Sequence, residues 1–208
     1  MKKRNENPKL SQHIVDFSFK ILLFLLFFSS IVVTFKSKEI LLLLYGVEFQ
    51  EASSSLILIF WSFTFYYLSQ LSQNLITIIG KQKNNFYYSI ILITSFLILL
   101  FFTLRSLGPT GAGLSRLISS IIGFLFLYFV LAKTEFKSDL FNFKNLVYFI
   151  SLFVIAYFSN VFGLFYFLLI ISISTIFLTY IFKYFNYEDF LLFNQFLKEP
   201  KWLKKYLK

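Results

Sequence analysis

The sequence predicts an all-α protein that crosses a lipid bilayer about six times. Hydrophobic residues make up 58% of the 208-residue chain and charged residues only 14%, whereas a soluble domain carries about 25% charged residues. The charges are concentrated between long apolar blocks. A helix needs about 20 consecutive apolar residues to cross a bilayer core about 30 Å thick. A water-soluble chain of this size could not bury so much apolar surface, which excludes the soluble classes.

The composition also limits the chemistry and the partners. The chain has no cysteine, so disulfides, thiolate catalysis and cysteine-based metal sites are excluded. The net charge of +10 comes from lysines and arginines at the ends of the apolar blocks and in the C-terminal region. Residues in those places set membrane topology and contact anionic lipid. We therefore expect membrane lipids, and not nucleic acid, as partners.

The expected organisation has three parts. Residues 1–13 form a basic cytoplasmic N-terminus, residues 14–184 the transmembrane domain, and residues 185–208 a basic cytoplasmic tail. No small-residue cleavage site follows the first apolar block, so we expect the N-terminus to remain in the mature chain. Apolar residues and lysines alternate in the tail, which suits an amphipathic segment lying on an anionic leaflet.

The first two spans are separated by a short elbow. The first span covers residues 17–35, and Lys20 near its start can extend its ammonium group to the lipid headgroups. The apolar stretch 40–45 is too short to cross, so we interpret it as an interfacial elbow that ends at Gly46. The second span, residues 52–79, is long enough to tilt.

The second half of this span carries a polar face. Tyr66, Gln70, Gln73, Asn74 and Thr77 recur at three- and four-residue steps and therefore share one side of a helix. Lipid does not tolerate such a face, so it must look into protein or water. Two interpretations stay open: hydrogen bonding between helices, or a substrate path lined by Gln70, Gln73 and Asn74.

A glycine–proline elbow joins the next two spans. The third span covers residues 86–104 and the fourth covers residues 112–132. Between them, Gly108, Pro109 and Gly111 interrupt the apolar pattern. We expect these three residues to form a structural elbow, as Gly46 does after the first span.

Arg116 is the one candidate for a charge inside the membrane. It lies about one turn into the fourth span, and we expect Arg105 to be its neighbour in space. A guanidinium that faces a central cavity could bind a pyrophosphate through bidentate hydrogen bonds. Alternatively, Arg116 extends to the headgroups or pairs with Glu48 or Glu51. Both interpretations stay open.

The last two spans form a hairpin, and the charges set the topology. Residues 146–162 and 164–182 are apolar and are joined by a short turn. Lysines and arginines are frequent in the N-terminus, in the turn 80–85, in the loop 133–145 and in the tail. The alternate connections hold only Lys36, Lys38 and Arg105. This bias places both termini in the cytoplasm.

The sequence offers no basis for an enzyme, and we expect no catalytic residue, cofactor or metal. His13 is the single histidine, and Asp16 beside it makes an incomplete ligand set. The predicted spans contain no acidic residue, so a carboxylate proton relay or sodium site is not expected. A glycine-rich phosphate loop and the metal-binding pattern of membrane alcohol phosphotransferases are also missing.

Three stretches together resemble the C-terminal half of polysaccharide-export flippases, members of the multidrug/oligosaccharidyl-lipid/polysaccharide exporter superfamily. They are LLLLYGVEFQEASSSLILI, LITIIGKQKN and SLGPTGAGLSRLISSIIGFLFLYFVLAK. In that family an elbow precedes a long span, a glycine–basic turn follows, and a glycine-rich elbow opens the next span. The matching residues here are Tyr45–Gly46, Gly80–Lys81 and Gly108–Gly111.

The resemblance covers residues 14–133 and extends to the last hairpin by hydropathy alone. It implies transport of an undecaprenyl-linked oligosaccharide across the bacterial cytoplasmic (inner) membrane by alternating access. Family members have two lobes, and this chain matches the second lobe plus the C-terminal hairpin. We therefore expect a partial flippase, truncated or split, with a second chain supplying the missing lobe in the split case. The alternative is a non-transporting membrane scaffold, an assembly component or an inactive fragment.

Overall fold

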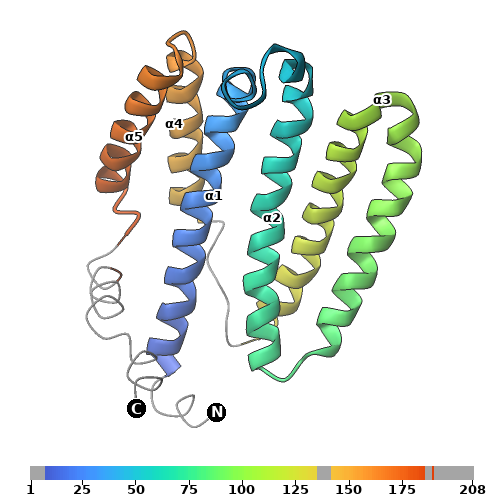
Figure 1. The fold of residues 1–208 in the computed structure, drawn as a ribbon. Coiled ribbons are helices and arrows are strands. Elements are labelled where there is room, and N and C mark those ends of the chain that lie inside the picture. The colour runs from blue at the N-terminus through green and yellow to red at the C-terminus, as the bar shows by residue number, and fades with distance from the viewer. Residues whose placement is uncertain (1–7, 135–141, 186–188, 190–208) are drawn as a thin grey trace, which may run out of the picture.

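The computed structural model describes residues 8–134, 142–185 and 189, and its regular structure there is helical throughout (Figure 1). This confirms the predicted all-α class. The elements in chain order are α1 (Pro8–Tyr45), the 3₁₀ helix η2 (Val47–Ala52), α2 (Ser53–Ile78), α3 (Lys83–Ala132), α4 (Phe143–Ser159) and α5 (Leu164–Ile181). Most of the predicted basic tail and the first seven residues lie outside the described residues.

Several helices have the length and composition of membrane spans. Four helical segments in the described part of the chain are long and apolar enough to cross a bilayer: Gln12–Tyr45, Val47–Ile78, Lys83–Ala132 and Leu164–Ile181. α4 is a shorter apolar helix of 17 residues. The helices thus agree with the prediction of a membrane protein.

α1 is longer than the predicted first span because it continues through the expected elbow region. The stretch 40–45 forms its last turns, and Gly46, with φ of 96°, follows its end. In Figure 1 these last turns are seen almost end-on, so they run across the end of the bundle. Leu43 and Leu44 are exposed there, which suits an apolar segment at a membrane interface.

α3 consists of two helical arms that meet at Gly108 and lie side by side (Figure 1). Gly108 has φ of 56° and ψ of −134°, a conformation that glycine adopts without steric cost. Pro109 follows directly, at the start of the second arm, where its missing N–H leaves no helical hydrogen bond unmade. The arms touch close to the elbow, because Thr103 Oγ1 donates a hydrogen bond to the Gly111 carbonyl at 2.9 Å.

α2 packs against both arms of α3. Its buried face is rich in small hydroxyl side chains, which allow close approach between membrane helices. These residues are Ser55, Ser62, Thr64, Ser69 and Ser72. Near the end of α2, Asn85 of the first arm donates a hydrogen bond to Thr77 Oγ1 at 2.8 Å. Near the middle of α2, Phe65 contacts Phe124 of the second arm, with ring centres 5.9 Å apart.

α1 lies between α2 on one side and the α4–α5 hairpin on the other (Figure 1). Toward α2, the hydroxyls of Ser30 and Thr64 are 3.0 Å apart. Toward α4, the rings of Phe27 and Phe149 have centres 4.2 Å apart. α1 therefore joins the two halves of the bundle.

Candidate functional site

The polar residues predicted on two different spans come together between α2 and α3. Arg116, on the second arm of α3, has its guanidinium carbon 5.2 Å from the centre of the Tyr66 ring on α2, a cation–π arrangement. Tyr88, on the first arm, is buried in the neighbourhood of Ser69, Tyr66 and Arg116. We call Arg116, Tyr66, Ser69 and Tyr88 the arginine cluster.

Local sequence explains how three helical segments can meet at this cluster. A Cβ atom on Gly123 would lie 2.8 Å from Cε2 of Tyr88, so only glycine leaves room for the ring. Gly123 is two helical turns after Arg116 and therefore lies on the same side of the second arm. The tyrosine ring of the first arm thus reaches the surface that presents the guanidinium.

The Arg116 side chain is half-buried, and its guanidinium has no hydrogen bond or ion pair within the described residues. Glu48 and Glu51, the predicted alternative partners, are exposed on η2, and none of the described ion pairs joins either of them to Arg116. A guanidinium carries five N–H donors. The guanidinium lies over the Tyr66 ring, and no carboxylate of the described helices accepts a hydrogen bond from it.

The polar face of α2 divides into two parts. Toward the end of the helix, Asn85 Nδ2 donates to the backbone carbonyl of Gln73 at 3.2 Å and to Thr77. This part fits the interpretation as hydrogen bonding between helices. Gln70 is half-buried and Asn74 is exposed, and their side chains form no hydrogen bond among the residues described. Gln70 and Asn74 lie on the same face of α2 as Tyr66. For these two residues, both the helix-packing interpretation and the substrate-path interpretation stay open.

Arg105, which was expected to be a neighbour of Arg116, makes no described contact with the arginine cluster. It is exposed on the first arm of α3, three residues before Gly108. None of the described contacts joins Arg105 to Arg116. The side chain that instead approaches Arg116 from the first arm is Tyr88, which the hydrophobic pattern alone does not single out.

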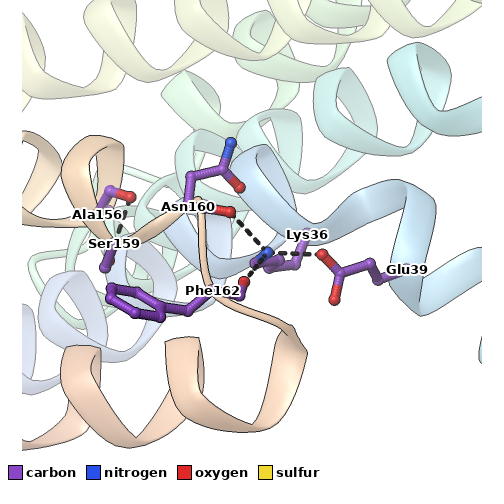
Figure 2. Close-up of polar contacts among 6 residues, drawn as sticks. All are labelled: Lys36, Glu39, Ala156, Ser159, Asn160 and Phe162. Carbon is purple, nitrogen blue, oxygen red and sulfur yellow. Dashed lines mark hydrogen bonds and ion pairs between the residues drawn. The ribbon is translucent and has the colours of Figure 1, made fainter.

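A second polar centre surrounds Lys36 of α1 (Figure 2). The sequence did not predict it, because Lys36 was interpreted there only as one of the charges that set the membrane topology. The Lys36 side chain is only 2% exposed. Its Nζ donates to Glu39 Oε1 at 2.6 Å, to the Asn160 carbonyl at 3.0 Å and to the Phe162 carbonyl at 2.5 Å. Lys36 therefore ties α1 to the turn between α4 and α5. The three-residue spacing to Glu39 was the only sequence signal of this pairing.

A third polar centre lies near the start of α1. Asp189 is fully buried, 3.0 Å from Lys20 Nζ and 3.3 Å from His13 Nε2. Lys20 is thus paired with a carboxylate rather than extended to headgroups. Tyr184 donates a hydrogen bond to the Lys20 carbonyl at 3.2 Å. Burial, reinforced by Tyr148 and Asp189, raises the pKa of the Tyr184 hydroxyl and keeps it a donor.

None of these centres has the composition of a metal site. No group of three or more histidine and carboxylate side chains that could hold a metal occurs in the part of the chain that the structure describes. Comparison with protein-family models, curated proteins and solved structures gives no match.

Proposed function

We propose that this chain is one lobe of a flippase that moves a lipid-linked oligosaccharide across the bacterial cytoplasmic membrane by alternating access. In this proposal α1, α2, the two arms of α3, α4 and α5 make six crossings, with both termini in the cytoplasm. A second polypeptide chain supplies the other lobe. The observation that carries the proposal is the open guanidinium of Arg116, which lies over Tyr66 on the α2 face that also carries the amides of Gln70 and Asn74.

The placement of Arg116 is costly unless it serves a ligand or an aqueous cavity. A charged side chain at the centre of a membrane helix costs about 2.5–3.5 kcal/mol on insertion scales, and the cost is smaller for Arg116, which lies about one turn into the predicted fourth span. Such residues therefore face protein or a water-filled path, and they mark routes for polar substrates. Arg116 has no acidic partner among the described residues that would neutralise it.

The surrounding side chains match the parts of a lipid-linked sugar. A guanidinium binds phosphate through two parallel hydrogen bonds, and this fits the diphosphate linkage. The amides of Gln70 and Asn74 can both donate to and accept from sugar hydroxyls. Transporters of this kind place such groups between two repeats. The proposal therefore puts the second lobe over this face of α2 and α3.

Binding to the purified chain tests this proposal without requiring the second lobe. The probe is an undecaprenyl-diphosphate-linked disaccharide, added to the protein in a non-ionic detergent and measured by native mass spectrometry. Arg116→Ala should weaken binding by about tenfold or more, because hydrogen bonds to charged groups contribute about 1.5–3 kcal/mol. Arg116→Lys should have an intermediate effect, because it keeps the charge and loses the bidentate geometry.

The matched control is Lys81→Gln, which removes an exposed cation in the turn between α2 and α3. It should leave binding unchanged. Equal affinity of the parent and Arg116→Ala proteins would contradict the proposed role of the arginine cluster. That result would favour a non-transporting scaffold or assembly component, in which the polar face of α2 only contacts other helices.

A further inference from the structure

A pocket of about 650 Å³ opens at the end of the molecule where α1 ends, α2 begins and the α4–α5 turn lies. None of its lining residues belongs to the arginine cluster. Its polar lining comes from segments far apart in the sequence: Thr34, Ser37, Lys38 and Glu39 of α1, Gln50 of η2, Ser53 and Ser54 at the start of α2, and Asn160 in the α4–α5 turn.

Two serine side chains line this pocket without a hydrogen-bond partner among the described residues. Ser37 and Ser53 are only 4% and 7% exposed, and both border the cavity. Neither side chain forms a hydrogen bond with any residue that the structure describes. Both hydroxyls are therefore available to donate to a ligand with acceptor atoms.

The charges around the pocket favour an anion. Glu39 is already paired with Lys36, whose Nζ also donates to two carbonyls of the α4–α5 turn (Figure 2). An ammonium group has three donors, so Lys36 is saturated and Glu39 is neutralised. Lys38 is exposed and forms no ion pair among the described residues. The free charge at the pocket is therefore the single positive charge of Lys38.

The surface beside the pocket indicates where this anion comes from. The last turns of α1 expose Leu42, Leu43 and Leu44 by 44%, 74% and 65%, and Leu42 itself lines the pocket. Apolar side chains next to a cationic group are typical of the boundary between headgroups and acyl chains. A ligand that satisfies both surfaces carries a phosphate and hydrocarbon chains.

We propose that this pocket binds the phosphodiester headgroup of an anionic glycerophospholipid. The Lys38 ammonium and the Ser37 and Ser53 hydroxyls donate hydrogen bonds to the phosphate oxygens, and the acyl chains lie along the exposed leucines of α1. This site is separate from the proposed transport path. It anchors the end of α1 to one leaflet.

Native mass spectrometry of the chain in a non-ionic detergent tests the site with dioleoyl phosphatidylglycerol as the probe. Lys38→Gln should weaken binding about tenfold, the effect of losing one charge-assisted hydrogen bond. The double variant S37A/S53A should weaken it by a similar factor. Lys81→Gln, the exposed lysine of the α2–α3 turn, should leave it unchanged. Dioleoylglycerol, which lacks the phosphate, should bind without any dependence on Lys38.

Three results would overturn the proposal. The first is equal affinity of the parent and Lys38→Gln proteins for phosphatidylglycerol. The second is a loss of equal size in Lys81→Gln, which would indicate attraction by net charge alone. The third is binding of glycerol 3-phosphate as tight as that of the lipid, which would assign the pocket to a soluble anion. Because Lys38 is exposed, the Lys38→Gln protein should fold. Its affinity for phosphatidylglycerol therefore tests the proposal even if the S37A/S53A protein does not fold.

Discussion

Individual lysines in this protein have different roles that depend on what surrounds them. Lys36 and Lys38 are two positions apart, yet Lys36 is buried and fully hydrogen-bonded while Lys38 is exposed without an ion partner among the described residues. Lys20, predicted to reach the headgroups, is paired with the buried Asp189 at 3.0 Å. The burial of each lysine side chain therefore says more about its role than its positive charge does.

This contrast leads to a prediction about stability. Lys36→Met should lower the free energy of unfolding by about 1–3 kcal/mol, because it leaves the two carbonyl acceptors of the α4–α5 turn and the Glu39 carboxylate without the buried ammonium that donates to them. Lys38→Met, its neighbour, should change stability by less than about 0.5 kcal/mol, as surface substitutions usually do. Thermal unfolding in detergent, followed by circular dichroism, measures both. Equal unfolding temperatures for the two variants would contradict the role assigned to Lys36.

At the scale of the elements, the elbow in α3 depends on two glycines for different reasons. Gly108 provides the left-handed backbone of the turn, whereas Gly111 allows the two arms to approach. A Cβ on Gly111 would lie 2.3 Å from the Thr103 carbonyl oxygen, which belongs to the backbone and cannot move aside alone. The Gly-Pro pair in the sequence predicted an interruption, but the close approach at Gly111 depends on the geometry of the hairpin.

Gly111→Ala should therefore push the arms apart near the elbow. We expect a loss of about 1–3 kcal/mol in stability, the usual cost of overpacking. Gly163→Ala is the matched control, because a Cβ there would meet nothing within 4 Å and its φ of −61° suits any residue. A disulfide between cysteines at positions 103 and 115 reports the separation, since the hydroxyls of Thr103 and Ser115 are 2.7 Å apart. Unchanged disulfide formation in Gly111→Ala would contradict this account.

At the scale of the whole molecule, the proposed transport function depends on how often the chain crosses the membrane. Residues 83–107 of α3 rise about 37 Å at 1.5 Å per residue, enough to cross a core of about 30 Å. The turn after α2 and the Gly108 elbow lie at opposite ends of this arm (Figure 1). The two ends should therefore lie on opposite sides of the bilayer.

Single cysteines can test this topology cleanly, because the natural chain has none. Lys81→Cys and Ser106→Cys place a thiol at two exposed positions, one at each end of the first arm. A membrane-impermeant maleimide should label Ser106→Cys from outside intact cells and Lys81→Cys only after the membrane is opened. Labelling of both positions from the same side would remove the six-crossing arrangement and the transporter proposal with it.

The sequence by itself determined that this protein is helical and suited to a bilayer, because the length and apolarity of a segment do not depend on its neighbours. It also singled out Arg116, the polar face of α2 and the Gly108 turn, which are all local patterns. Only the tertiary structure decided which charges are satisfied: Lys36 is paired at the α4–α5 turn and Lys20 with Asp189, whereas Arg116 lies over the Tyr66 ring with no hydrogen bond or ion pair among the described residues. Those outcomes depend on which distant segments pack together, and hydropathy carries no information about that choice.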